Sequence, residues 1–159
     1  MIKSRGMRTL VVDDDPFILE LVEMIGRYNK IGEVVTVTSG KDALALLSDP
    51  HTIFDNLLID ISMPNMNGID LCCAVRDLPA YRETPITMLT AMRDITHMGD
   101  AFLARADVYA TKPFVVDQLA ARLQKAQVAF CAQSLTTAPP APPGSIAQAF
   151  DFDCLAPSG

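Results

Sequence analysis

Five short apolar runs alternate with segments of helical periodicity along this chain, and that alternation limits its fold more than any other feature. Each run is rich in β-branched or other apolar residues, which is typical of a buried strand. The expected strands are residues 9–12, 34–38, 54–59, 86–89 and 108–111. After the first strand, apolar residues recur at the spacing of one helix face: Ile18, Leu21, Val22 and Ile25.

Helices are expected between and after these strands. They cover the regions around residues 18–25, 41–47, 69–75, 95–104 and 115–133. Asp15 and Pro16 supply an N-cap and a first-turn proline to the first helix, and Ser39 caps the second. Five strand–helix units with short connections predict a five-stranded parallel sheet covered by helices on both faces, the doubly wound α/β class.

Polar residues stand at the ends of four of the expected strands. They are Asp13-Asp14, Asp60, Thr90 and Lys112. In doubly wound sheets, ligands bind beyond the carboxyl ends of the strands, near the point where the strand order reverses. We therefore expect these side chains to converge in one crevice.

The acidic triplet that follows residues 10–12 predicts a metal site. Like charges held so close raise one another's pKa unless a cation lies between them. Mg²⁺ prefers oxygen ligands and commonly takes one or two carboxylates. A helix start explains Asp15, but it gives no reason for Asp13 and Asp14. We interpret the triplet as two metal-facing acids followed by a helix cap.

Composition narrows the classes of partner. The formal net charge of −6 disfavours direct binding to nucleic acid or to an anionic membrane surface. No apolar stretch approaches the roughly 18 to 20 residues of a membrane span, and the N-terminus lacks an apolar signal segment. We therefore expect a cytoplasmic protein with protein partners. Cysteines 72, 73, 131 and 154 lack metal-ligand spacing and are expected to be reduced, with Cys72 and Cys73 packing inside a helix.

The expected organisation is an N-terminal extension (residues 1–6), one domain (residues 7–133) and a tail (residues 134–159). The tail is rich in Ala, Pro, Thr and Ser, which favours an extended or flexible segment. Its end holds Phe150, Phe152 and Leu155 between acids, which is compatible with a short docking motif or with an ordinary flexible end. The tail is too short and too poor in apolar residues for a DNA-binding or enzymatic domain.

Four motifs, taken together, resemble the receiver domain of two-component response regulators. They are residues 11–16, 59–68, 89–91 and 112–114, and the resemblance extends over about residues 7–133. It implies a single-domain regulator with the flavodoxin-like receiver fold. The chain departs from the family at Arg105-Ala106, where Gly-Ala is common, and at Asn67, where an acid is common. Without that glycine, the end of the helix at 95–104 is less defined.

The resemblance implies a chemical role for each strand-end residue. Asp60 would be the phosphoacceptor, a carboxylate nucleophile that forms an aspartyl-phosphate. Mg²⁺ would be held by Asp13, Asp14, Asp60 and the backbone carbonyl of Ser62, and would stabilise charge on the phosphoryl oxygens. Lys112 would pair with Asp60 and later with the phosphate, aimed inward by a cis bond to Pro113.

Two further residues would carry the signal away from the acceptor. Thr90 matches the hydroxyl that turns toward the phosphoryl group, and Tyr109 matches the aromatic ring that follows it inward. Together they would shift the helix at 95–104 and the strand at 108–111. Tyr109 is equally compatible with an ordinary, partly buried strand position.

The implied partners are proteins. The phosphodonor would be a histidine kinase or a histidine phosphotransfer domain, and the downstream protein target is unknown; a phosphorylation-dependent dimer is also compatible. Phe17 and Met24 lie about 100° from the inward stripe of the first helix, so we expect either a donor-docking surface there or flanking core positions.

Two other functions compete with a phosphorylation switch. A phosphorelay intermediate or phosphate sink without its own output partner would have the same motifs, and the sequence does not separate it from a switch. A Mg²⁺-dependent phosphatase of the haloacid dehalogenase type would need a second acid where Ser62 stands. We therefore expect a regulator that catalyses only its own phosphorylation and dephosphorylation, not an enzyme.

Overall fold

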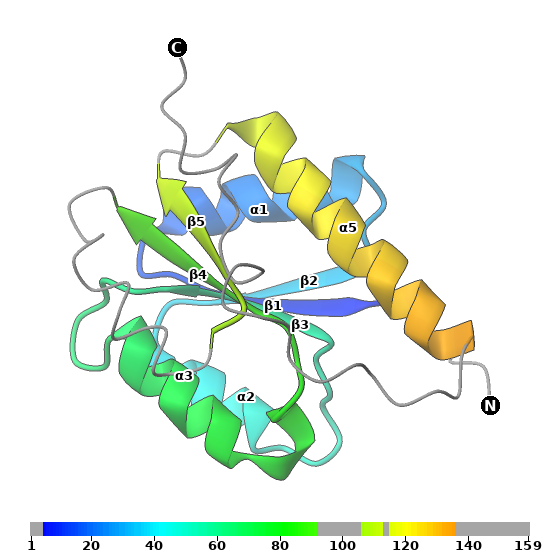
Figure 1. Cartoon of the computed structure of the whole chain (residues 1–159). Coiled ribbons are helices and arrows are strands. Elements are labelled where there is room, and N and C mark those ends of the chain that lie inside the picture. Colours follow the sequence, from blue (N-terminus) through cyan, green and yellow to red (C-terminus); the bar gives the residue numbers. More distant parts are fainter. Residues whose placement is uncertain (1–4, 92–105, 113–114, 136–159) are drawn as a thin grey trace.

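The computed structural model describes residues 5–91, 106–112 and 115–135 (Figure 1). A parallel five-stranded sheet has the strand order β2-β1-β3-β4-β5. Its strands are β1 (Arg8–Val12), β2 (Glu33–Val37), β3 (Asn56–Asp60), β4 (Ile86–Ala91) and β5 (Val108–Lys112). The described helices are α1 (Pro16–Tyr28), α2 (Gly40–Leu47), α3 (Gly68–Asp77), the 3₁₀ turn η1 (Pro79–Tyr81) and α5 (Val116–Leu135). The predicted doubly wound α/β fold is confirmed.

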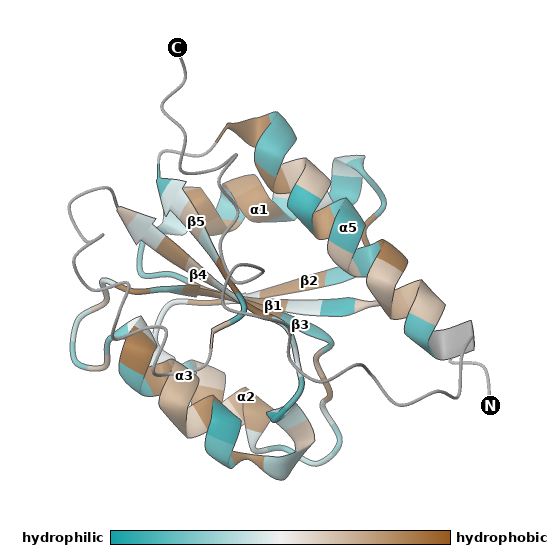
Figure 2. Ribbon diagram, viewed as in Figure 1, coloured by the Kyte–Doolittle hydropathy of each residue, from teal (hydrophilic) through white to brown (hydrophobic). Residues whose placement is uncertain are grey.

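Helices cover both faces of the sheet, with α1 and α5 on one side and α2 and α3 on the other (Figure 1). Successive strand residues point to opposite faces, so neighbours in one strand enter different cores. In β1, Leu10 and Val12 pack with α2 and α3, whereas Val11 packs with α1 and α5. Hydrophobic residues accordingly gather along the central strands (Figure 2).

Three helices begin with side-chain caps. Asp15 Oδ1 accepts a hydrogen bond from the N–H of Phe17 at 3.0 Å, directly before Pro16. Ser39 Oγ caps α2 by accepting from the N–H of Asp42. These two caps confirm the predictions. At α3, the amide oxygen of Asn67 accepts from the Asp70 N–H at 2.8 Å, so the residue that departs from the family pattern is itself a good cap.

Several details differ from the sequence-based expectations. Strand β3 begins at Asn56 instead of Phe54, and the Phe54 N–H donates to the Tyr81 hydroxyl instead of to a neighbouring strand. Leu19 is buried in α1, whereas Ile18 is half-buried. Cys72 is buried as predicted, but the prediction for Cys73 was wrong.

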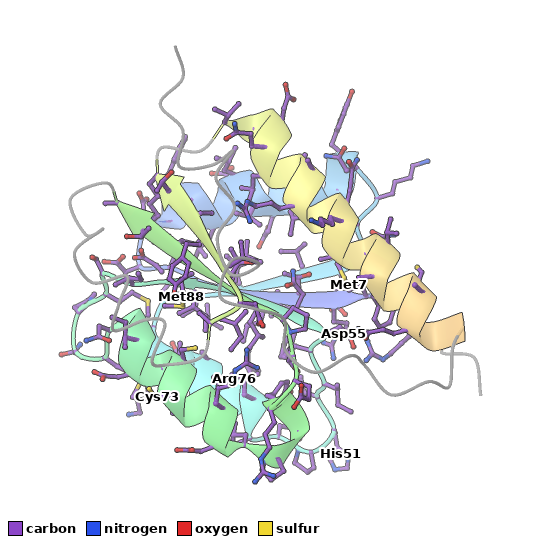
Figure 3. All side chains as sticks on the ribbon, in the orientation of Figure 1. Met7, His51, Asp55, Cys73, Arg76 and Met88 are labelled. Atoms are coloured by element: carbon purple, nitrogen blue, oxygen red, sulfur yellow. The ribbon has the colours of Figure 1, made fainter. Side chains whose placement is uncertain are left out.

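Helix α3 has one face toward the sheet and one toward solvent, and this explains the error. Cys73 lies on the exposed face, while Arg76, three residues later, is buried (Figure 3). The buried face of α3 is made by Leu71, Cys72, Val75 and Arg76, and Cys73, about 100° further round the helix from Cys72, lies outside it. The expected helix at 95–104, the Lys112–Pro113 bond, Arg105, Cys154 and residues 136–159 lie outside the described residues.

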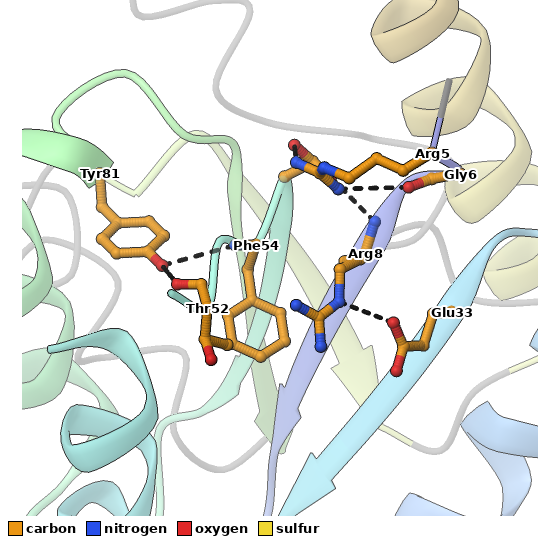
Figure 4. A network of polar contacts seen from close by, with 8 residues as sticks. Arg5, Gly6, Arg8, Glu33, Thr52, Phe54 and Tyr81 are labelled. Atoms are coloured by element: carbon orange, nitrogen blue, oxygen red, sulfur yellow. Dashed lines mark hydrogen bonds and ion pairs between the residues drawn. The ribbon is translucent and has the colours of Figure 1, made fainter. Parts of the chain in front are cut away.

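The amino-terminal edge of the sheet carries an arginine network (Figure 4). The guanidinium of Arg5 makes two hydrogen bonds with the Asp55 carboxylate, at 2.7 and 2.9 Å, and lies 5.9 Å from the ring centre of Phe130 in α5. Arg8 donates to Glu33 at 2.6 Å and lies 5.1 Å from the ring centre of Phe54. These contacts join Arg5, before β1, to the residue that precedes β3 and to the far end of α5, and they join β1 to β2.

Within the described residues, no helix combines the length and the apolar character that crossing a bilayer demands.

Candidate functional site

The site lies at the carboxyl edge of the two central strands. Val12 of β1 is the register partner of Ile59 of β3, so the residues that follow them, Asp13 and Asp60, lie side by side. The strand order reverses here, because the chain runs from β1 to β2 on one side and then returns to β3 on the other. This is the position where open α/β sheets bind ligands.

Three carboxylates meet at this edge. One oxygen from each of Asp13, Asp14 and Asp60 lies within 4.8 Å of the others. Asp13 and Asp60 are buried, and Asp14 is exposed. Buried carboxylates at this spacing need a positive counter-charge, and an all-oxygen donor set with one open side fits Mg²⁺. The residues present therefore fit a hard divalent cation.

Lys112 brings a positive charge to the same point from β5. Its Nζ atom lies 2.6 Å from Asp13 Oδ2 and 3.2 Å from Asp60 Oδ1. Asp13 is held a second time, because its Oδ1 atom accepts a hydrogen bond from the Asp15 N–H at 2.9 Å. The ammonium group thus bridges two acids and lies closer to Asp13.

Burial and charge determine the protonation behaviour of these groups. Burial, reinforced by the neighbouring Asp13 charge, raises the pKa of Asp60 to about 6, although Lys112 opposes the rise. Burial also raises the pKa of Asp13, and the hydrogen bond from Lys112 counteracts it. Burial alone would lower the pKa of Lys112, but the hydrogen bond to Asp13 and the charge of Asp60 raise it overall.

The loop after β3 is built closely around Asp60. Ile61 N–H donates to the Leu89 carbonyl, and Gly68 N–H donates to the Ile61 carbonyl, both at 2.9 Å. Asn65 has a positive φ of 69°, a conformation that asparagine tolerates better than most residues. A turn of this kind brings the start of α3 directly over the end of β3.

The two expected switch residues are both buried. Thr90 is fully buried in β4, and its hydroxyl donates to the Ala91 carbonyl at 3.1 Å. Tyr109 is fully buried in β5, within the core that faces α2 and α3, and burial raises the pKa of its hydroxyl. The structure brings Lys112 to the acids, while Tyr109 lies in the packed core.

Ser62, the remaining residue of the expected metal site, is exposed and lies two residues after Asp60.

Two features of the site have no clear signal in the sequence. The Asp13–Lys112 pair joins residues 99 positions apart, and the strand-end pattern alone does not say which acid the lysine contacts. The Asp15 N–H, which holds Asp13 Oδ1, is a backbone group, so residue type carries no information about it. The short connection between the first strand and the first helix is the sequence feature most closely related to this hydrogen bond.

A parallel sheet of order 2-1-3-4-5, with its acidic crevice where the order reverses, defines the flavodoxin-like class of doubly wound α/β domains. Comparison with known proteins narrows the class. A family model for the response regulator receiver domain matches residues 9–124. The chain therefore belongs to the response regulator receiver domain family. Members of this family are phosphoacceptors of two-component systems, not enzymes in the usual sense, and they generally bind Mg²⁺ at an acidic pocket.

Curated relatives differ in how much of their length this chain covers. Protein PilG of Pseudomonas aeruginosa is 30% identical over 118 residues, which are 74% of this chain and 84% of PilG. The DNA-binding response regulator MtrA of Mycolicibacterium smegmatis is 37% identical over 117 residues, which are 74% of this chain but 49% of MtrA. The chain thus spans about half the length of MtrA.

Solved structures agree with this assignment over most of the chain. A response regulator structure from Chloroflexus aurantiacus has a TM-score of 0.70 and 33% identity, covering 78% of this chain and 99% of that one. The chemotaxis response regulator CheY4 of Vibrio cholerae has a TM-score of 0.69 and 30% identity, covering 76% and 98%. The expected receiver fold is confirmed.

Proposed function

We propose that this chain is a phosphorylation switch that accepts a phosphoryl group from a phosphohistidine donor onto Asp60 and signals through protein–protein contact. The observation that carries the proposal is the placement of Asp60, buried between two other acids and 3.2 Å from the ammonium group of Lys112. A carboxylate nucleophile needs such a cation to offset the charge that phosphorylation adds.

Mg²⁺ is part of the proposed chemistry. Asp13, Asp14 and Asp60 would hold it, with the backbone carbonyl of Ser62 as a further proposed ligand. When bound, it would neutralise negative charge on the phosphoryl oxygens. The protein's own part is to hold the Asp60 carboxylate in place and to supply Lys112 as a fixed positive charge. The proximity of the three carboxylate oxygens, within 4.8 Å of one another, supports this assignment.

Thr90 and Tyr109 are the proposed route from acceptor to output surface. Thr90 lies in β4 one residue beyond Leu89, the register partner of Asp60. Tyr109 lies in the adjacent strand β5, where it pairs with Met88. Both are fully buried, so a movement of either side chain displaces its packed neighbours. This arrangement supports transmission of a local charge change to the β4–β5 side of the sheet.

Helix α1 offers the proposed docking surface for the phosphodonor. Phe17, Met24 and Tyr28 are 68%, 58% and 89% exposed. Together with half-buried Leu21 they occupy positions spaced four, three and four residues apart, which is the spacing of a seam between packed helices. Phe17 follows Asp15 and Pro16 directly, so one end of the seam adjoins the acidic edge. A helical histidine kinase or phosphotransfer domain fits such a surface.

Labelling with acetyl phosphate in the presence of Mg²⁺ tests the acceptor. The wild-type chain should incorporate one acid-stable, hydroxylamine-sensitive phosphoryl group, and Asp60→Asn should incorporate none. Asp42→Asn, which changes an exposed acid of α2, is the matched control and should label normally. Persistent labelling of Asp60→Asn would contradict the assignment.

Two rates test the docking surface. Phe17→Ala should slow transfer from a phosphohistidine donor while leaving labelling by acetyl phosphate unchanged, because the small donor needs no protein contact. Val128→Ala removes a similarly exposed apolar side chain from α5 and should slow neither reaction. Equal loss of both reactions in Phe17→Ala would show a defect at the acceptor and not at a docking surface.

Signalling through protein contact is tested by capture with and without beryllofluoride, a phosphoryl mimic. A partner retained only by the mimic-treated chain supports a switch. Partners restricted to phosphohistidine donors, in both states, would favour the relay instead.

A further inference from the structure

Three apolar side chains are exposed where α1 and α5 approach the edge of the sheet at which β2 begins. Met24 and Tyr28 lie one turn apart on α1 and are 58% and 89% exposed, and Val128 of α5 is 69% exposed. The two helices are joined at this level, because the Gln124 side chain of α5 donates to the Asn29 side-chain oxygen at 3.0 Å. Tyr28 directly precedes Asn29. Val128 lies one turn beyond Gln124, so the three apolar residues belong to one surface, the α1–α5 patch.

Positively charged side chains lie close to the α1–α5 patch. Arg27 has 82% of its side-chain surface exposed and lies 3.6 Å from Glu23, and Lys30 and Lys125 are also exposed. Glu23 and Glu33, the acids nearest to Lys30 along the chain, already accept hydrogen bonds from side chains of the sheet, at 2.9 and 2.6 Å. Among the described residues, neither lysine forms an ion pair. The patch is therefore bordered by unneutralised positive charge, although the formal net charge of the chain is −6.

A segment of the same chain has the complementary chemistry. Residues 150–155, which lie outside the described residues, read Phe-Asp-Phe-Asp-Cys-Leu. We refer to them as the acidic tail segment. Its phenylalanines offer apolar surface for the patch, and its carboxylates offer negative charge for the two lysines. Towards the other end of α1 the exposed charges are negative, at Asp14, Asp15 and Glu20, so an acidic segment would be repelled there.

The tail also leaves the domain at the correct edge of the sheet. Phe130, near the end of α5, lies 5.9 Å from the guanidinium of Arg5, which precedes β1 (Figure 1). Lys30 lies at the same edge, just before the start of β2. Residues 136–149 form a linker of about 14 residues that spans about 40 Å when extended, whereas the end of α5 is only about 10 Å from Val128. Such a linker gives the segment an effective concentration near the millimolar range, so weak contacts suffice.

We infer that the acidic tail segment docks on the α1–α5 patch of its own chain, where it covers Met24 and Tyr28 and limits the access of a phosphodonor to α1. The effect on the donor rests on the proposed function, whereas the docking itself does not. Exposed ion pairs contribute little free energy, so the aromatic contacts supply most of the binding. The charges decide which end of α1 the segment selects.

Amide chemical shifts of the whole chain, measured without any donor, test the docking. Phe150→Ser combined with Phe152→Ser removes the aromatic contacts and lies outside the folded domain. This tail variant should shift the amide resonances of residues 24–30 and 124–128, and it should leave the resonances of α3 unchanged. Resonances of residues 24–30 that are the same in wild type and in the tail variant would overturn the inference.

Ala138→Ser combined with Ala141→Ser, in the linker, is the matched control and should shift neither group of resonances. Shifts that are independent of protein concentration support docking within one chain. Shifts that vary with protein concentration would overturn the inference, because they would place the segment of one copy on the patch of another.

A second pair of variants tests the charges. Lys30→Glu combined with Lys125→Glu should release the segment, so the heteronuclear Overhauser effect of the Phe152 amide should fall towards the value of an unstructured peptide. Lys41→Glu combined with Arg82→Glu makes the same change of charge at exposed positions away from the patch and should leave the value unchanged. Equal values for the two double variants would overturn the role of the lysines in the docking.

Transfer from a phosphohistidine donor tests whether the docked segment limits access. The tail variant should accept phosphate from the donor about fivefold faster than wild type, within the usual range of coupling between two ligands, while labelling by acetyl phosphate keeps its rate. An unchanged rate of transfer would overturn the covering effect. The docking surface for the donor is judged separately by Phe17→Ala, whose failure to slow transfer would count against the proposed function and leave the tail docking to the chemical shifts.

Discussion

Gly68 lies against the backbone of Asp60 so closely that a Cβ at residue 68 would be 2.1 Å from the Asp60 carbonyl oxygen. Its own N–H donates to the Ile61 carbonyl at 2.9 Å. The first residue of α3 is thus fixed on the end of β3. Any side chain there would push the helix away from Asp60 or displace Asp60 itself.

Gly68→Ala is therefore expected to destabilise the fold by about 2 kcal/mol or more, as overpacking against rigid backbone does. Urea unfolding measures the change in the free energy of unfolding. Gly6→Ala is the matched control, because a Cβ at residue 6 would meet the Gly32 Cα at an ordinary 3.6 Å. Similar stabilities for the two variants would show that the loop yields at little cost.

The raised pKa of Asp60 predicts a pH-dependent stability in the absence of divalent cations. Burial and the nearby Asp13 charge raise this pKa to about 6 from a usual value of 3.8. The folded state therefore holds a proton that the unfolded chain has already lost between these pH values. Linkage then requires the free energy of unfolding attributable to Asp60 to fall as pH rises from about 4 to 6 and to stay level above.

Asp60→Asn removes this ionisation, so the free energy of unfolding of the variant should rise relative to that of the wild type across the same pH interval. The growth should be about 2 kcal/mol, since one pKa unit corresponds to about 1.4 kcal/mol. Urea unfolding of both proteins at pH 4.5 and pH 7.5, in EDTA, measures it. A difference between the two proteins that does not change with pH would contradict the raised pKa.

Thr9, near the start of β1 and between β2 and β3, has a hydroxyl that should reduce stability. Among the residues that the structure describes, its Oγ1 atom is buried without a hydrogen-bond partner. Thr9→Val keeps the shape and removes the polar atom, so the free energy of unfolding should rise by about 1 kcal/mol. Thr36→Val is the contrasting variant, because the Thr36 hydroxyl donates to Glu23 at 2.9 Å. In thermal unfolding, Thr9→Val should raise the melting temperature, and Thr36→Val should lower it.

Arg76 joins the end of α3 to the segment that leads into β4. Its buried guanidinium donates to three backbone carbonyls, those of Tyr81, Arg82 and Thr84, and to the Asp107 carboxylate at 2.9 Å. Arg76→Leu leaves those carbonyls without this donor and should cost about 3 kcal/mol.

Asp107→Asn should cost less, about 1 to 2 kcal/mol, because the Asp107 side chain is 51% exposed and the three carbonyls still accept hydrogen bonds from the buried Arg76 guanidinium. Its oxygen can still accept the hydrogen bond that Ile86 N–H now donates. Chemical unfolding compares the two variants. A cost for Asp107→Asn that matches that of Arg76→Leu would show that the ion pair, and not the carbonyl contacts, holds this corner together.

The strand ends could be located from sequence because each apolar run stops at a polar residue. Val12 gives way to Asp13 and Ile59 to Asp60, and parallel pairing then brings both acids to one edge. The starts of helices α1 and α2 could also be predicted, because the side chains of Asp15 and Ser39 cap them. These features depend on residues close together in the chain.

Features that depend on distant residues were not accessible in this way. The twist of the sheet and the depth of burial determine which acid Lys112 contacts. Local sequence patterns predict neither of them. The placement of Cys73 depended on the rotation of α3 about its axis, which Arg76, near the end of this helix, helps to set through its hydrogen bond to the Tyr81 carbonyl. The contact of Arg5 with Asp55 links positions 50 residues apart, ahead of the first strand.

The bridge between Lys112 and Asp13 joins the last described strand to the first, across 99 residues of chain. Synthesis begins at the amino terminus, and a domain generally folds as a unit. In a nascent chain, Asp13 and Asp60 are therefore synthesised before Lys112, the residue that pairs with them. The ion pair between Lys112 and the acidic edge is consequently a property of the whole folded domain, because no fragment that ends before residue 112 contains both partners.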